Sequence, residues 1–360
     1  MESKSSPIRY FLGANTARGF TSFYNEFIHT ERGDTIWYIK GGPGNGKSSL
    51  MKSIAQEAVL RGETVEYAYC SGDPDSLDGI YLRKRHTAYV DATSPHVQEP
   101  EEPGASGRYL DLSGCFHPGL TEKREEIRRL FSLYREQYQR CYQLLSAASE
   151  AAPEKTPGII WAADRTAVRQ RASAFAARFL QPGKSSAKEH RFLSAFTCRG
   201  PVFFWETAQA VGRVCTLDNA LGLADDFLQE LSIQCERIGC PCILSPDPLE
   251  ADRLEGIMIP SCSIAVLATK KQGDYPGAVW KHIRLDAIAE PSSLRQHREE
   301  YRRCAVLQEG LLQQAESSLR EAKRIHDDLE AVYRPYLDTE KLDEIMSHHK
   351  AMLFEANTIC

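Results

Sequence analysis

Hydrophobic runs rich in β-branched and aromatic residues recur along the chain and alternate with segments of helical spacing. In the first half these runs predict strands near 35–40, 64–70, 86–91 and 108–112. In the second half they predict strands near 213–217, 241–245, 262–268 and 281–286. Because strands that alternate with helices form parallel sheets flanked by helices, we expect an α/β fold with two such sheets.

The two halves of the sequence are similar to one another. Leu77–Ile80 returns 177 positions later as Leu254–Ile257. Three more segments return in the same order: Arg9–Gly19 as His190–Gly200, Pro103–Ala105 as Pro276–Ala278, and Arg124–Arg129 as Arg298–Arg303. The repeat predicts two tandem copies of one domain, 1–185 and 186–360, joined through a linker at 181–188 that is rich in charge and in residues that break helices.

Each copy ends in a long segment with helical spacing, at about 119–180 and about 291–355. Apolar residues recur there at three-, four- and seven-residue steps, which are typical of an antiparallel helical hairpin. These residues are Ile127, Leu130, Tyr134, Tyr138, Cys141 and Leu145, then Leu307, Leu311, Ala315, Leu319, Ala322 and Leu329. We expect each hairpin to pack within its own lobe; binding of a protein partner by the hairpins is the alternative.

A glycine-rich segment, Gly41–Ser48, fits the spacing G-x-x-x-x-G-K-[ST] of a phosphate-binding Walker A loop. A predicted strand precedes it and helical spacing follows, as the motif requires. Glycines let backbone N–H groups converge on a phosphate, and the helix N-terminus adds partial positive charge. We expect Lys47 to contact the β- and γ-phosphates of a nucleoside triphosphate and Ser48 to bind Mg²⁺. The predicted nucleotide-binding residues are Gly42, Pro43, Gly44, Asn45, Gly46, Lys47, Ser48 and Ser49.

Three acidic residues are candidates for catalysis together with Lys47. Asp91 ends the predicted strand at 86–91, as in a Walker B segment, and would bind the metal directly or through water. The second copy keeps that apolar strand but has Thr269 where an acid would stand. Asp73 and Asp75 follow another strand, where a base or an acceptor-substrate ligand would be placed, although Asp, Pro and Ser are also ordinary turn residues. We expect the neighbouring Asp78 to be structural, because the second copy has Glu255 at that position.

The second copy lacks a working phosphate loop. Alignment of the copies places Leu223, Ala224 and Asp225 at the positions of Gly46, Lys47 and Ser48. A leucine brings a Cβ to a point where backbone must approach phosphate, and the lysine charge is missing. We therefore expect one nucleotide site per chain, with Asp225 and Asp226 repelling an anion in the second copy.

Composition and charge limit the possible partners. The formal net charge of −5 gives no footprint for nucleic acid or for an anionic membrane. No apolar run approaches the roughly 20 residues of a membrane span. The sequence starts without the apolar core of a signal peptide, so we expect a cytoplasmic protein whose cysteines are free thiols.

The motifs resemble those of known proteins. The loop at 41–48 is similar to that of the P-loop NTPase superfamily. Nearly the whole chain resembles a poorly characterised bacterial family of tandem P-loop proteins described only as ATPases or ATP-binding proteins. The motifs that carry this closer resemblance are Ala14-x-Thr16-x-x-Gly19-Phe20, Cys70-Ser71-x-Asp73-Pro74-Asp75-Ser76-Leu77-Asp78-Gly79 and Val90-Asp91-x-Thr93-x-Pro95-His96-Val97.

Three functions are compatible with a single phosphate loop. The first, which we favour, is a Mg²⁺-dependent ATPase that moves its lobes or a partner, with ATP and Mg²⁺ as the cofactors. The second is a small-molecule or nucleotide kinase in which the acidic turn at 73–78 receives the acceptor. The third is a nucleotide-sensing scaffold with negligible turnover. The sequence does not distinguish ATP from GTP.

Overall fold

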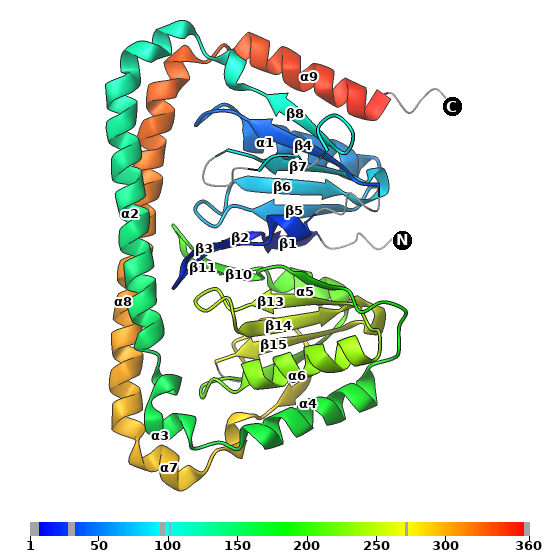
Figure 1. The fold of residues 1–360 in the computed structure, drawn as a ribbon, viewed down its shortest axis with the longest axis vertical. Coiled ribbons are helices and arrows are strands. Elements are labelled where there is room, and N and C mark those ends of the chain that lie inside the picture. Colours follow the sequence, from blue (N-terminus) through cyan, green and yellow to red (C-terminus); the bar gives the residue numbers. More distant parts are fainter. Residues whose placement is uncertain (1–6, 28–32, 94–97, 101, 271–272, 356–360) are drawn as a thin grey trace.

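The computed structural model describes residues 7–27, 33–93, 98–100, 102–270 and 273–355. The chain forms two α/β lobes stacked along the long axis of the molecule, and a pair of long helices runs along one side of both (Figure 1). The predicted α/β class with two helix-flanked sheets is thereby confirmed. Pro95–Val97 of the third family-like motif lie outside the described residues.

The sheet of the first lobe has six strands in the order β1-β5-β6-β7-β4-β8. Their bounds are β1 (Ile8–Phe11), β4 (Thr35–Lys40), β5 (Val65–Tyr69), β6 (Leu77–Leu82), β7 (Thr87–Asp91) and β8 (Gly107–Asp111). Neighbouring strands are parallel except at β6, which is antiparallel to both β5 and β7.

The sheet of the second lobe repeats this arrangement, in the order β16-β12-β15-β14-β13-β9. Its strands are β9 (Lys188–His190), β12 (Arg213–Asp218), β13 (Cys242–Pro246), β14 (Leu254–Ile259), β15 (Ile264–Thr269) and β16 (Val279–Ile283). Here β14 is the antiparallel strand, paired with β13 and β15. The shared strand order supports the tandem duplication.

We expected parallel sheets, but both sheets are mixed. The repeated segments Leu77–Ile80 and Leu254–Ile257 lie in the antiparallel strands β6 and β14, which we did not predict. Their acidic residue and glycine hide the strand pattern in the sequence. The glycines have a packing reason: a Cβ on Gly79 would lie 3.1 Å from the carbonyl oxygen of Tyr89 on the neighbouring strand. A Cβ on Gly256 would lie 3.3 Å from the carbonyl oxygen of Val266.

Each sheet is covered on one face by a helix of its own copy and a helix of the other copy. On the first sheet these are α1 (Lys47–Leu60) and α9 (Thr339–Glu355), which buries Leu342 and Phe354 there. On the second sheet they are α6 (Ala224–Arg237) and α4 (Arg165–Phe179). The C-terminal arm of each copy therefore crosses to the opposite lobe (Figure 1).

The long helices α2 (Arg124–Glu150) and α8 (Arg298–Tyr333) lie antiparallel, one from each copy. They pack through the predicted apolar positions, including Leu130 against Leu329 and Leu145 near Leu319. The expected hairpin within each copy is thus replaced by a pair between copies. Helix length explains this pairing. α2 has 27 residues and spans about 40 Å, whereas a strand spans only ~17–20 Å, so the helix extends beyond its own lobe and runs along the other lobe as well.

Short elements complete the fold. The hairpins β2–β3 and β10–β11 lie between the lobes, and α5 covers the second face of the second sheet. At the centre, Phe11 and Phe192 exchange backbone hydrogen bonds of 2.9 and 3.0 Å. The bounds are β2 (Gly13–Thr16), β3 (Gly19–Ser22), β10 (Ser194–Thr197), β11 (Gly200–Phe203), α3 (Pro157–Ile160), α5 (Trp205–Val211) and α7 (Pro291–Gln296).

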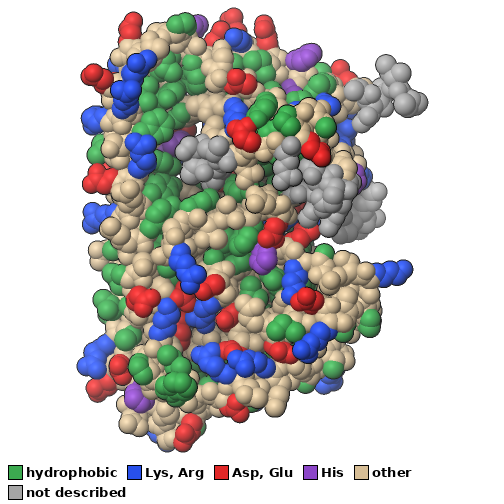
Figure 2. Space-filling model, viewed as in Figure 1, with side chains coloured by type: hydrophobic (Ala, Val, Ile, Leu, Met, Phe, Trp, Pro, Cys, Tyr) green, Lys and Arg blue, Asp and Glu red, His purple; other side chains and the backbone are tan. Residues whose placement is uncertain are grey.

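The surface carries both signs of charge. On the face shown in Figure 2, acidic and basic side chains are interspersed over both lobes and the helix pair. Across the described part of the chain, no helix is both long enough and apolar enough to cross a bilayer.

Candidate functional site

The glycine-rich loop (residues 41–46) connects β4 to α1 at the carboxyl edge of the first sheet. Gly44 and Gly46 have φ angles of +69° and +80°, a backbone region that is unfavourable for residues with a Cβ atom. This backbone turns the chain directly into α1, which begins at Lys47. The Lys47 ammonium donates a hydrogen bond of 2.9 Å to the carbonyl oxygen of Gly42, so in this structure it is folded back onto the loop.

Asp91 lies beside Lys47, as the sequence predicts. It ends β7, which pairs with β4 and aligns Asp91 with Ile39, just before the loop. Its Oδ2 lies 3.7 Å from the Lys47 Nζ, and both side chains are largely buried. Its Oδ1 accepts hydrogen bonds from the backbone N–H and the hydroxyl of Thr93, which fix the carboxylate in this direction.

Ser48 is held by the next strand. Its Oγ accepts a hydrogen bond of 3.0 Å from the N–H of Leu77 at the start of β6. The hydroxyl proton and a second lone pair stay available to a ligand. Ser48 and Asp91 both line the same cavity, so the structure brings the two predicted metal-binding residues to one place.

The two acidic candidates of the 73–78 turn have different positions. Asp73 lines the cavity, where its carboxylate also accepts hydrogen bonds from the Asp75 N–H and the Ser76 hydroxyl. Asp75 is not among the lining residues, and its half-exposed carboxylate pairs with Arg199 of the second lobe. Asp73 therefore stays a catalytic candidate, whereas the structure places Asp75 at the lobe interface.

The cavity has a volume of about 340 Å³ and lies between the glycine-rich loop and the helix pair. Pro43 to Ser49 form one wall together with Asp73, Asp78 and Asp91. The opposite wall is made by residues that we did not predict as site residues: Tyr134 and Tyr138 of α2, and Lys323, His326 and Glu330 of α8. Tyr134 and Tyr138 belong to the apolar positions that the sequence predicts on this helix. Only the fold shows that their side chains line the cavity at the glycine-rich loop.

The far wall is mostly uncharged apart from Lys323 and Glu330. Burial raises the pKa of Tyr134 to about 12 and also raises that of Tyr138. Burial lowers the pKa of His326; the neighbouring Glu330 opposes this change, while Lys323 and Lys47 add to it. The lowered pKa favours the neutral imidazole of His326 at pH 7, which can donate one hydrogen bond and accept another.

The counterpart loop of the second lobe (residues 218–223) has a different backbone and is occupied by the protein's own side chains. Leu223, at the position of Gly46, has a φ of −88°. The N–H groups of Ala220 and Leu221 donate to the carboxylate of Asp286, at 2.9 and 3.1 Å. An internal carboxylate therefore takes the loop amides that a phosphate would need.

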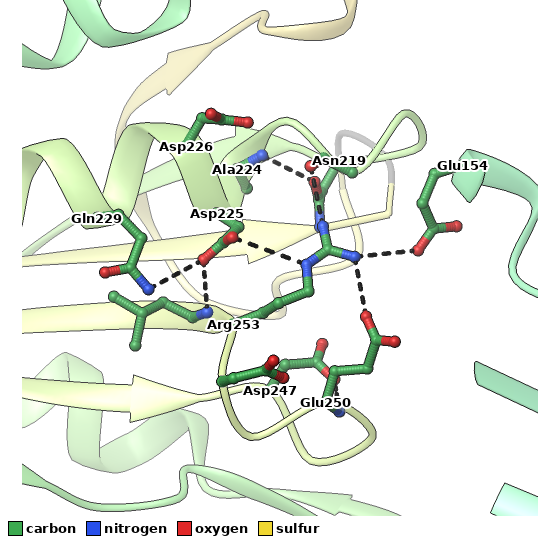
Figure 3. A network of polar contacts seen from close by, with 12 residues as sticks. Glu154, Asn219, Ala224, Asp225, Asp226, Gln229, Asp247, Glu250 and Arg253 are labelled. Carbon is green, nitrogen blue, oxygen red and sulfur yellow. Dashed lines mark hydrogen bonds and ion pairs between the residues drawn. The ribbon is translucent and has the colours of Figure 1, made fainter. Parts of the chain in front are cut away.

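Arg253 fills the other side of the counterpart loop (Figure 3). Its guanidinium donates to the carbonyl oxygen of Gly222 at 2.9 Å and lies 3.8 Å from Asp225. It also faces Glu250 at 3.2 Å and Glu154 at 3.6 Å. The guanidinium thus has carboxylate partners on three sides and is held in the loop.

Asp225 and Asp226, in the first turn of α6 after the counterpart loop, are paired inside the protein and do not face solvent as free charges. Asp225 accepts a 2.9 Å hydrogen bond from the Leu254 N–H, which repeats the bond between Ser48 and Leu77. Asp226 pairs with Arg165 and Arg169 of α4. Our expectation of repulsion by two free acids is corrected accordingly: this loop is closed by internal partners.

Asp78 and Glu255 occupy matching buried positions on β6 and β14. Both Glu255 carboxyl oxygens accept hydrogen bonds from the Ser194 hydroxyl, at 2.9 and 2.8 Å, and Oε1 also accepts one from Ser245. Burial and the charge of Asp247 raise the pKa of Glu255 to about 8, against the lowering effect of these hydrogen bonds. The environment of Glu255 is that of a structural carboxyl group in the second lobe.

This carboxyl group predicts a pH dependence of stability. The folded chain holds its proton up to about pH 8, whereas the unfolded chain loses it near pH 4.3. Between these values the native state binds more protons, so stability should fall as pH rises, by roughly 1 kcal/mol per pH unit from this group. Glu255→Gln should remove that part of the slope. Urea unfolding at several pH values measures it, with the exposed Glu236→Gln as the control; equal slopes in the two variants would refute this assignment.

Comparison of the chain with protein-family models, with curated proteins and with solved structures found no match.

Proposed function

We propose that this chain is a P-loop NTPase that binds one ATP with Mg²⁺ at the glycine-rich loop and hydrolyses it. The contrast between the two loops carries the proposal. The first loop opens on a cavity with Lys47, Ser48 and Asp91 at its wall. In the counterpart loop, Asp286 takes backbone N–H groups that would meet a phosphate, and the Arg253 guanidinium is bound to the Gly222 carbonyl oxygen.

The residues of the first loop have separate tasks in this proposal. The loop N–H groups and the N-terminus of α1 would bind phosphate oxygens. The Lys47 ammonium would exchange the Gly42 carbonyl oxygen for phosphate oxygens, a stronger partner because both are charged.

Hard oxygen donors fit Mg²⁺, and two protein ligands suffice because this ion keeps water and phosphate in its shell. Ser48 and Asp91, the latter directly or through water, would supply them. Within the described ranges, no group of three or more His, Cys, Asp and Glu side chains is arranged to hold a metal. When bound, Mg²⁺ would neutralise charge on the phosphates.

Hydrolysis then requires a water placed in line with the terminal phosphate. Its oxygen forms a bond to the γ-phosphorus, the bond from phosphorus to the bridging oxygen breaks, and that electron pair leaves with ADP. The products are ADP, inorganic phosphate and a proton. Asp73 lines the cavity and is the candidate that orients the water and accepts its proton.

Stoichiometry and products test the proposal. Calorimetry with a non-hydrolysable ATP analogue should give one site per chain. The triple variant Leu223→Gly, Ala224→Lys, Asp225→Ser should also bind one and change turnover little, because Asp286 and Arg253 still fill the counterpart loop. Two sites in the unmodified chain would contradict the assignment.

The fate of ATP separates the three functions. Release of inorganic phosphate and ADP from protein, ATP and Mg²⁺ alone supports the ATPase. ADP formation that depends on an added acceptor would indicate a kinase. Tight binding without turnover would indicate a sensor.

Asp91 gives a sharper test of the metal assignment. Asp91→Asn should lower turnover about 100-fold, because a neutral amide stabilises the charged metal shell poorly, while analogue affinity changes only a few-fold. Phosphate release and calorimetry on one preparation measure both. Full activity in the variant would reassign Asp91 to holding the 91–93 turn through Thr93.

A further inference from the structure

Helix α8 belongs to the second copy but forms part of the wall around the loop of the first. It presents Lys323, His326 and Glu330 to the cavity, at positions that share one face of a helix. The contact with the loop is close: a Cβ on Gly44 would lie 3.4 Å from the Cβ of Glu330. The second copy therefore lines the space in which the phosphates of a bound nucleotide would lie.

Lys323 is the cation that this helix brings to the cavity. Its ammonium lies 3.5 Å from Asp73 and 2.5 Å from Asp327, and its side chain is 30% exposed. Burial opposes its charge, but the hydrogen bond with Asp327 and the charge of Asp73 outweigh this and raise the pKa of Lys323. Lys323 is therefore a charged and partly exposed group next to Asp73, the candidate catalytic carboxylate.

The other lysines of the cavity have different partners. Lys47 is folded onto the Gly42 carbonyl oxygen, and Lys52 donates to the backbone carbonyl oxygen of Asp75. Among the described lining residues, only these two and Lys323 carry a full positive charge. Lys323 and Lys47 line the same cavity, and the charges of both lower the pKa of His326, so a phosphate bound in the cavity would feel both ammonium groups.

The second half of the molecule contains a matching pair. Lys155, carried by the arm of the first copy, reaches Glu250, which stands at the position of Asp73 in the aligned copies. It also donates to the Ser149 hydroxyl at 3.0 Å. Each copy thus provides a lysine to the acidic turn of the other. Lys155 and Glu250 also line a cavity, of about 490 Å³, but none of residues 218–223 lines it and Arg253 is bound to the loop. In the first half, Lys323 shares its cavity with the glycine-rich loop itself.

We infer that Lys323 is a catalytic residue of the nucleotide site, supplied by the second copy to contact the terminal phosphate of ATP bound in the first. This inference rests on the proposed function and adds a residue to it. On binding, the Lys323 ammonium exchanges Asp73 for γ-phosphate oxygens, and Asp73 becomes free to orient the attacking water. Lys323 forms no covalent bond; it stabilises negative charge on the oxygens of the phosphate that is transferred.

The test compares nucleotides that differ only in the terminal phosphate. Lys323→Ala should weaken binding of a non-hydrolysable ATP analogue about tenfold or more, since a charge-assisted contact is lost, and leave ADP affinity unchanged. Lys323→Arg should preserve most of the preference for the triphosphate. The control is Arg324→Ala, the next residue of α8, whose exposed guanidinium pairs with Glu321 and Asp328 outside the cavity.

The outcomes separate this inference from the proposed function. If the unmodified chain binds neither nucleotide, both fail. If it binds the analogue in a manner that depends on Lys47, but Lys323→Ala keeps the ratio of analogue to ADP affinity, only the assignment of Lys323 is refuted. Lys323→Gln keeps most of the length of the side chain without its charge and serves as the second variant if alanine lowers the unfolding midpoint; equal weakening of ADP and analogue in it would show a structural role.

Discussion

Lys47→Ala should abolish nucleotide binding at micromolar protein while the chain stays folded. The ammonium is the only charged group that α1 places at its first turn beside the glycine-rich loop, and Asp91 lies 3.7 Å from it. Its loss removes a charge-assisted contact with phosphate, worth roughly 10- to 100-fold in affinity, and leaves Asp91 unpaired beside the incoming anion. We expect turnover to fall by at least about 100-fold.

Calorimetry with the ATP analogue and a phosphate-release assay measure the two effects. Lys84→Ala is the matched control, because Lys84 is an exposed lysine of the same lobe whose ammonium donates to the Gly62 carbonyl oxygen. Unchanged circular dichroism and unfolding midpoint show that the fold is kept. A Lys47→Ala protein that still binds the analogue with the original affinity would refute the nucleotide site at this loop.

Residues 1–185 alone should fail to unfold cooperatively, although they contain the whole first sheet and its loop. Their partners α8 and α9 would be missing. Removal of α9 alone uncovers the faces of Trp37 and Tyr89, against which His349 packs, and loses the buried Leu342 and Phe354. Each buried apolar side chain of this size stabilises a fold by about 1.5–3 kcal/mol, out of a total of about 5–15 kcal/mol.

Urea titration followed by circular dichroism measures this effect. Mixing the fragment with residues 186–360 should restore a cooperative transition, because the contacts between the two copies are non-covalent. The same mixture should restore nucleotide binding, since α8 supplies part of the cavity wall. If the isolated fragment were as stable and as active as the full chain, the second copy would have no structural or catalytic role in the first.

The sequence predicts the parts of this molecule that depend on local patterns. Strands β4, β5, β7 and β8 lie within one residue of the expected positions, because each is a hydrophobic run next to a turn. The motif places Lys47 and Ser48 by their spacing alone. Asp91 meets them because parallel neighbours end at the same edge of a sheet.

The missed features depend on contacts between distant segments. Strand β6 contains a buried acid, Asp78, and a glycine, Gly79, that lets the neighbouring strand approach, so its pattern is not that of a strand. Lys323 and Tyr138 reach the cavity only because the long helices cross to the opposite lobe. The closure of the counterpart loop by Asp286 is equally invisible, since the two segments are far apart in the sequence. Missing glycine and lysine indicate a lost phosphate site, but not what replaces the phosphate.

The exchange of arms between lobes has a consequence for how the chain reaches its native state. During synthesis, the strands of the first sheet and α1 leave the ribosome long before Thr339–Glu355, the segment that covers their apolar face. Contacts between residues so distant along the chain form slowly, because a large loop must close before they stabilise anything. The first lobe therefore remains incomplete until the last residues of α9 are made, and its uncovered sheet is open to aggregation during that interval.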